Sequence, residues 1–161
     1  MDTPIAIRTA SRAEAPIVQL MLEELAASIG KPGGIKGSVA NIERFGFGPS
    51  RLFEALIASQ SGVDVGLLLF FPEYSSWRGR PGIYVQDLYV IESARGAGVA
   101  RALLSEVAQR CEEMEGTYLR LSASADNIAA QHFYLKAGFA PSDEERLFVL
   151  EGKDFAAFIR E

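Results

Sequence analysis

A glycine-rich run at residues 95–100, Arg-Gly-Ala-Gly-Val-Ala, has the composition and the position of an anion-binding loop. It follows an almost continuously apolar stretch, residues 83–91, and precedes apolar residues spaced four apart, a pattern that indicates a strand leading into a helix. The first amides of a helix have no partner within it and lie at the positive end of its dipole, so they can hold a phosphate. An ordinary strand-to-helix turn built from small residues is the structural alternative.

The composition limits the classes of function. A chain of 161 residues, 48% hydrophobic and 23% charged, can bury one core, and we expect a single domain over residues 1–161. A net charge of −5 argues against a general binder of nucleic acid or of anionic membranes. We find no apolar run long enough to span a bilayer and no signal-peptide pattern at the start. One cysteine suits a reducing compartment, so we expect a cytoplasmic protein, and we expect no metal site.

The elements that must position the loop follow from periodicity and from the turn residues between them. We expect strands at residues 5–8, 52–59, 63–71, 83–91, 117–123 and 147–150. We expect helices after a capping box at Ser11 and Glu14, at residues 38–47, after the glycine-rich run, and at residues 127–137 and 154–159. Pro72 is expected to end the third strand, followed by a long loop over residues 74–82.

This order of elements predicts the fold class. Strands with helices inserted among them favour an α/β (α+β) fold, with a sheet of six or seven strands flanked by about four helices. Residues 83–91 are apolar apart from Gln86 and Asp87, so they should form a central strand covered on both faces. Two polar side chains in such a strand need partners or a function.

Two motifs together resemble a known family. Residues 95–100 fit Arg-x-x-Gly-x-Gly/Ala, and residues 126–134 read Asp-Asn-x-x-Ala-x-x-Phe-Tyr. The pair resembles the pyrophosphate-binding signature of the GNAT superfamily of N-acetyltransferases, and the resemblance extends from about residue 63 to residue 150. It implies the GNAT fold, whose mixed, mostly antiparallel sheet splays between central strands, and it implies acetyl-CoA as co-substrate.

The resemblance also implies where the cofactor would bind. In that family the diphosphate rests on backbone amides after the arginine, and the pantetheine arm lies along the preceding strand. The corresponding residues here are Leu88, Val90, Arg95, Gly96, Gly98, Val99 and Ala100, with Arg101 near them. Glycine and alanine keep this surface small, which lets a bulky phosphate approach the backbone.

Residues 126–134 supply further candidates. Asn127 matches a family residue that hydrogen-bonds near the pantetheine, and an N-cap role is the structural alternative. Tyr134 matches the tyrosine that protonates the departing thiolate in many members and also binds near the cofactor, and an aromatic packed behind the helix is its alternative. His132, the single histidine, is expected to be structural or exposed.

A narrower resemblance concerns the acceptor. Residues 74–79 and 83–90 look like the diamine and thialysine (polyamine) N-acetyltransferase branch, which implies a homodimer that acetylates primary amines of small molecules. The branch has Glu immediately before the strand Asp, where this chain has Gln86. Gln takes no proton at neutral pH, and deprotonating an amine of pKa about 10.4 at pH 7 costs about 4.6 kcal/mol. We favour Asp87 as the base, with Glu92 or a less basic amine as alternatives.

Aromatic side chains near this strand could complete an acceptor pocket. Trp77, Tyr74 and Tyr84 could form a wall that attracts a cationic amine, beside Gln86 and Asp87. Aromatics near a hairpin more often cover core, which is the alternative. Nothing around Cys111 suggests an acyl-cysteine intermediate, so we expect direct attack of the amine in a ternary complex.

Other functions stay open at this point. A non-catalytic acyl-CoA-binding or regulatory domain would explain Gln86 as a lost base, and an acetyltransferase acting on a protein amine is a substrate variant. A dinucleotide-binding unit fits less well, because Arg101 stands where a third small residue should follow Gly96 and Gly98.

Overall fold

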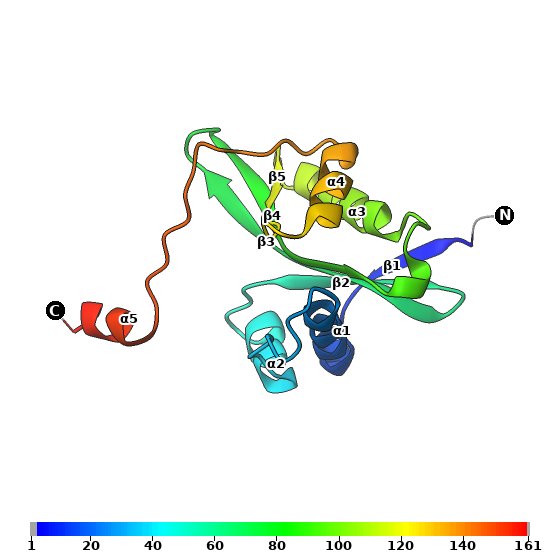
Figure 1. Cartoon of the computed structure of the whole chain (residues 1–161), viewed down its shortest axis with the longest axis horizontal. Coiled ribbons are helices and arrows are strands. Elements are labelled where there is room, and N and C mark those ends of the chain that lie inside the picture. The colour runs from blue at the N-terminus through cyan, green and yellow to red at the C-terminus, as the bar shows by residue number, and fades with distance from the viewer. Residues whose placement is uncertain (1–2, 161) are drawn as a thin grey trace. The chain divides into compact units, whose positions relative to one another are not determined.

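The computed structural model describes residues 3–160, which belong to two compact units, Met1–Ala125 and Asp126–Glu161 (Figure 1). The first unit holds a sheet with helices on both faces, and the second holds two helices joined by extended chain. Among the described residues, none of the helices combines the length and the apolar composition that a membrane crossing requires.

The sheet of the first unit has the strand order β1-β2-β3-β4-β5. Its strands are β1 (Ile5–Thr9), β2 (Glu54–Gln60), β3 (Val63–Ser75), β4 (Arg80–Val90) and β5 (Leu119–Leu121). The pairs β1–β2, β2–β3 and β3–β4 are antiparallel, and β5 is parallel to β4. The mixed α/β class is thus confirmed, but the described residues contain five strands and not the six or seven expected.

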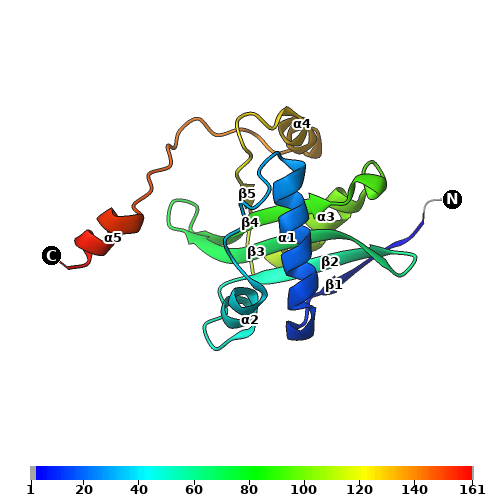
Figure 2. The same ribbon diagram turned by 60° about the horizontal axis from the view of Figure 1, so that its bottom comes forward.

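Helices cover both faces of this sheet. On one face lie α1 (Ala15–Ser28) and α2 (Val39–Phe47), and on the other lies α3 (Val99–Glu113) (Figure 2). Side chains of α1 and alternate residues of β2 and β3 form one buried cluster, which includes Val18, Met21, Leu22, Ile57, Leu67 and Leu69. The intervening strand residues face α3 and are equally buried, including Leu56, Leu68 and Phe70. β2 and β3 are therefore covered on both sides. Residues 83–91, which were expected to be covered on both faces, are buried at Ile83 and Val85, whereas residues 86–90 are exposed or half-buried.

Local interactions explain where α1 begins. The backbone amide of Ser11 donates to Oε2 of Glu14 at 2.9 Å, so the expected capping box is present. It opens a short 3₁₀ turn, Arg12–Glu14, which continues into α1. Arg8 of β1 donates to the Glu14 carboxylate at 2.8 Å and to both oxygens of Asp64 on β3 at 2.8 and 3.0 Å. One arginine therefore joins β1, β3 and the start of the first helix.

The hairpin between β3 and β4 is longer than the sequence suggests. Pro72 was expected to end its strand, but β3 continues to Ser75, and the expected loop shrinks to residues 76–79. The reason is that β2 begins at Glu54, opposite Phe70, so Pro72 has a strand partner only on the β4 side. A residue without an N–H is tolerated at such an edge.

The second unit contains α4 (Ile128–Ala137) and α5 (Gly152–Phe158). Residues 139–151 between them form no helix or strand, so the strand expected at residues 147–150 is absent (Figure 1). Four consecutive apolar residues favour a strand only where another strand pairs with them, and here none does. Neither helix buries a residue, and the single domain expected over residues 1–161 stays a prediction.

Candidate active site

The glycine-rich loop has the backbone geometry that its sequence predicts. Gly96 and Gly98 have φ angles of 79° and 82°, in the left-handed region that other residues avoid. Gly98 is the N-cap of α3, and the first hydrogen bond of that helix runs from the Ala102 amide to the Gly98 carbonyl at 2.9 Å. The amides of residues 99–101 precede this bond, so they have no partner within the helix and lie at the positive end of its 15 residues.

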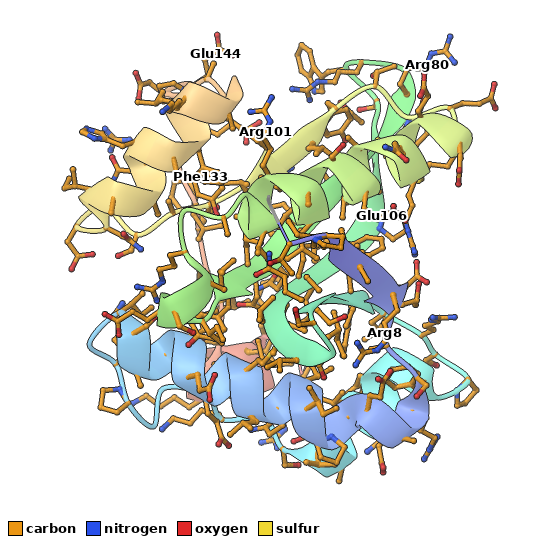
Figure 3. All side chains as sticks on the ribbon, turned by 90° about the vertical axis from the view of Figure 1, so that its right-hand side faces the viewer. Arg8, Arg80, Arg101, Glu106, Phe133 and Glu144 are labelled. Atoms are coloured by element: carbon orange, nitrogen blue, oxygen red, sulfur yellow. The ribbon has the colours of Figure 1, made fainter. Side chains whose placement is uncertain are left out.

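Two arginines flank this loop. Nε of Arg95 donates to the carbonyl oxygen of Val90 at 3.1 Å, which ties the loop to the end of β4. Arg101 projects from the first turn of α3 (Figure 3). The helix sits close to the sheet here, because a Cβ added to Gly66 of β3 would lie 2.8 Å from Cγ1 of Val99. The first turn of α3 therefore packs directly on the sheet beside the glycine-rich loop.

The edge of β4 beside this loop is open. β4 pairs with β5 over residues 83–85 alone, opposite residues 119–121, although β4 continues to Val90. Among the described residues, no strand pairs with the β5 side of residues 86–90, where Leu88 and Val90 lie. The pairing of β4 with β5 thus stops before the end of β4 that leads to residues 95–100, so an extended ligand could hydrogen-bond this edge.

A β-bulge decides how Gln86 and Asp87 are displayed. Phe70 of β3 is opposite Val85 and Leu69 is opposite Asp87, so Gln86 is the extra residue of β4. Gln86 is exposed, whereas Asp87 shares the α1/α2 face with Leu69 and, two residues on, with Tyr89. Burial raises the pKa of the Asp87 carboxyl above its usual value. A carboxylate in this environment is a stronger base than one in water.

Glu24 of α1 is a residue that the sequence analysis missed. Burial, and then the nearby carboxylate of Glu24, raise the pKa of the Tyr89 phenol, so Glu24 faces the same part of β4 as Asp87. The sequence contained a signal for this residue. Glu24 follows Ile17 by seven residues, or two helical turns, so it lies on the same partly buried side of α1. An acid at such a position needs a partner.

The expected aromatic wall is dispersed. Trp77 lies in the turn of the β3–β4 hairpin and is 99% exposed. Tyr84 lies four residues after Arg80, where β4 begins, so it is roughly 13 Å along the strand from that turn. The Tyr84 ring stacks on Phe71 at 5.2 Å, has the Arg120 guanidinium 5.2 Å from its centroid, and donates its hydroxyl to Ser122 at 3.0 Å. Tyr84 is therefore already partnered, and Trp77 touches no core.

The second unit holds the remaining candidates. Oδ1 of Asn127 accepts a hydrogen bond from the Ala130 amide at 3.1 Å, so this residue is the N-cap of α4. The Tyr134 ring makes edge-to-face contacts with Phe133 and Phe139 at 5.4 and 5.6 Å, and burial raises the pKa of its phenol. His132 is exposed, as expected.

Comparisons with known proteins identify the class. The model of the acetyltransferase (GNAT) family matches residues 21–139, and the chain belongs to this family. The enzyme class predicted from the sequence, an acetyl-CoA-dependent N-acetyltransferase, is thereby confirmed at the level of the family.

Individual relatives are more distant. The chain is 29% identical over 136 residues to thialysine N-epsilon-acetyltransferase of Mus musculus, covering 80% of this chain and 79% of that protein. It is 27% identical over 139 residues to spermidine/spermine N(1)-acetyltransferase-like protein 1 of Homo sapiens, covering 82% of this chain but only a fifth of that protein. A solved aminoglycoside N-acetyltransferase in complex with CoA has a TM-score of 0.73 at 17% identity, with 95% and 97% of the two chains covered.

Proposed function

We propose that this protein transfers the acetyl group of acetyl-CoA to a primary amine of a small molecule, such as a diamine, a polyamine or a lysine-like amino acid. The observation that carries the proposal is the left-handed glycine loop at residues 95–100, placed beside an open edge of β4. The similarity to thialysine and spermidine/spermine acetyltransferases supports the choice of acceptor.

The residues present fit the co-substrate. A polyanionic diphosphate would be held by the amides of residues 96–100 together with Arg95 and Arg101, in a chain whose net charge of −5 offers no general attraction. The pantetheine arm would hydrogen-bond the open edge of β4 at Leu88 and Val90. Acetyl-CoA supplies an activated acyl thioester when bound. Asn127 could contact the arm only in addition to its observed role as N-cap.

Asp87 would prepare the amine for attack. Its carboxylate would accept a proton from the incoming ammonium group, directly or through one water, and the raised pKa makes this transfer less unfavourable. Gln86, exposed at the bulge, would bind the acceptor without taking a proton. Glu24 would add a second negative charge on the α1/α2 face, which suits a dication better than a neutral amine.

Tyr134 would complete the reaction by donating its phenolic proton to the departing thiolate. Burial raises the pKa of this phenol, so it stays protonated at neutral pH and can act as a donor. Amine attack and thiolate departure would take place in one ternary complex. We also propose a homodimer and, on the presence of a single thiol, a cytoplasmic location.

The proposal is tested by measuring free thiol released from acetyl-CoA with thialysine, lysine, ornithine, spermidine, an aminoglycoside and a lysine-containing peptide. We expect turnover with at least one small diamine or polyamine and a lower kcat/KM with the peptide. Turnover with the peptide alone would instead favour a protein acetyltransferase. Tight binding of acetyl-CoA with no product from any amine, including after Gln86→Glu, would favour a non-catalytic binder.

A further inference from the structure

The hairpin of β3 and β4 continues past the point where β2 stops, and we call residues 71–84 the hairpin arm (Figure 1, green). Pairing of β3 with β2 stops at Phe70, whereas β3 and β4 stay paired as far as Ser75 and Arg80. Trp77 lies in the turn at the tip of the arm and is 99% exposed. Its side chain covers no core, so packing within the chain does not explain this tryptophan.

The tip of the hairpin arm combines the residue types that dominate protein interfaces. Residues 74–80 include Tyr74, Trp77, Arg78 and Arg80 and contain no acidic residue. Tyr74 is 69% exposed, and both arginines are exposed. Tryptophan, tyrosine and arginine are the types enriched among the residues that contribute most to binding energy. The tip therefore has the composition of a binding surface.

Contacts behind the tip hold these side chains in place. The Arg78 guanidinium lies 4.3 Å from the centroid of the Tyr118 ring, and the Arg78 amide donates to Oγ of Ser75 at 3.2 Å. Arg120 of β5 donates to both carboxylate oxygens of Glu73 on β3, at 2.5 and 3.0 Å. A surface that is ordered before binding loses less conformational entropy when a partner arrives.

The same contacts set the charge of the hairpin arm. Glu73 is its single acidic residue, and Arg120 neutralises that charge. Within residues 3–160, neither Arg78 nor Arg80 forms an ion pair with a carboxylate. The arm thus presents two unpaired positive charges in a chain whose net charge is −5. Complementary charge favours a partner that is acidic at this contact.

The backbone of the arm offers a place for an extended chain. β4 pairs with one side of residues 71–75, and among the described residues no strand pairs with the other side. An unpaired strand edge can accept an extended segment of another protein, whose main-chain hydrogen bonds give affinity while its side chains give specificity. Pro72 has no N–H, so the other residues of this edge would supply the donors.

We propose that the hairpin arm is a docking site for an extended, acidic segment of another protein. The segment adds a strand beside residues 71–75, its carboxylates pair with Arg78 and Arg80, and one of its apolar side chains packs on Trp77. Val90, at the other end of β4, is ten residues from Arg80, or roughly 33 Å, so the docked segment leaves the glycine-rich loop free. This proposal is independent of the acetyl-transfer reaction.

Binding of a model peptide is the first test. The probe is a short peptide of alternating glutamate and valine, added to the full chain, and the readout is the emission of Trp77, the single tryptophan. We expect saturable binding with a blue shift, because the contact removes this side chain from water. The same peptide with lysine in place of glutamate, or with alternate backbone nitrogens methylated, should bind at least about tenfold more weakly.

Substitutions on the arm then locate the site. With the glutamate–valine peptide labelled with fluorescein, we expect the Kd from anisotropy to rise at least about tenfold in Trp77→Ala and in Arg80→Gln. Lys31→Gln is the matched control, because it removes a positive charge just after the end of α1 and should leave the Kd unchanged. All three side chains are exposed, so the Tm of each variant should equal that of the parent.

Several results would overturn the proposal. One is no binding of the glutamate–valine peptide, and another is equal binding of its lysine or methylated form. A Kd that Trp77→Ala and Arg80→Gln leave unchanged would place the peptide elsewhere. Tighter binding of a single-stranded thymidine oligonucleotide, weakened by the same two variants, would make the arm a nucleic-acid site instead.

Discussion

At the scale of single residues, the bulge at Gln86 has the clearest functional consequence. It shifts the alternation of β4 by one position, so Asp87 rather than Gln86 lies opposite Leu69, on the face that α1 covers. The carboxylate that remains in this strand is thus the partly buried one. Loss of an acid at position 86 need not abolish base catalysis if position 87 supplies it.

Asp87→Asn tests this assignment. We expect kcat/KM to fall by about 10²–10⁴, the range of general-base contributions, with little change in affinity for coenzyme A. In the parent chain kcat/KM should fall as pH falls through the raised pKa of Asp87, and the variant should lack this dependence. Glu92→Gln is the control for the alternative base. A large loss in Glu92→Gln with none in Asp87→Asn would reverse the assignment.

The same carboxyl should reduce stability near neutral pH. Its pKa is higher in the folded than in the unfolded chain, so the folded state binds more protons, and stability falls as pH rises from about 4 through the raised value. Asp87→Asn should therefore have a higher Tm than the parent at pH 7 and an equal Tm at the acid end of that window. Thermal unfolding at both pH values measures the difference, and a lower Tm at pH 7 would contradict this reasoning.

Tyr134→Phe tests the proton donor. We expect transfer to slow by about 10²–10⁴ while the Kd for coenzyme A, measured by calorimetry, stays within twofold. Tyr118→Phe removes a phenol elsewhere in the chain and should leave the rate unchanged. Equal rates for Tyr134→Phe and the parent chain would remove this phenol from the mechanism.

At the scale of elements, the loop between β4 and α3 holds the ligand through its backbone, so its conformation is what a substitution changes. Gly98→Ala forces an alanine to φ near 82°, at a cost of about 1–2 kcal/mol, and should weaken coenzyme A binding as well as lower the Tm. Gly62→Ala is the matched control, because Gly62 has φ of 78° in the β2–β3 turn and open space around its Cβ position. We expect similar loss of Tm in both variants and weaker binding in Gly98→Ala alone.

The elements of the first unit could largely be predicted from the sequence, since periodicity and capping residues act locally. The capping box at Ser11 and Glu14 and the loop at residues 95–100 are examples. The length of the β3–β4 hairpin could not be predicted, because Pro72 is acceptable only where the pairing of β3 with β2 has stopped, and that depends on register. The same is true of the bulge at Gln86.

The strand expected at residues 147–150 shows a second limit. An apolar run records that a segment must be buried, but the run does not say which strand will pair with it. Glu24 shows a related limit. The helical spacing places it on the partly buried side of α1, but the sequence does not show that it lies beside Tyr89 of β4. Site residues that depend on a partner from a distant element are the ones that the sequence conceals.

At the scale of the whole molecule, the Arg8 cluster joins segments far apart in the sequence and should set acid stability. The Ser11 amide, and then the Arg8 guanidinium, lower the pKa of the Glu14 carboxyl. A lowered folded pKa contributes stability that is present above about pH 4.5 and is lost as pH falls through the lowered value. Glu14→Gln should have a lower Tm than the parent at pH 7, and the gap should close toward pH 3. A gap that stays constant with pH, or one shown equally by Glu113→Gln at the exposed end of α3, would contradict this.

The lone thiol of the chain has a practical consequence. Cys111 is 3% exposed on α3, and its Sγ lies 3.4 Å from the carbonyl oxygen of Tyr118. Colorimetric thiol reagents should react slowly with the native protein, so almost all of their signal in a transfer assay would come from the released product. A fluorophore attached through an introduced cysteine would likewise mark one chosen position, so the native fold already provides the clean background that labelling experiments usually require engineering to obtain.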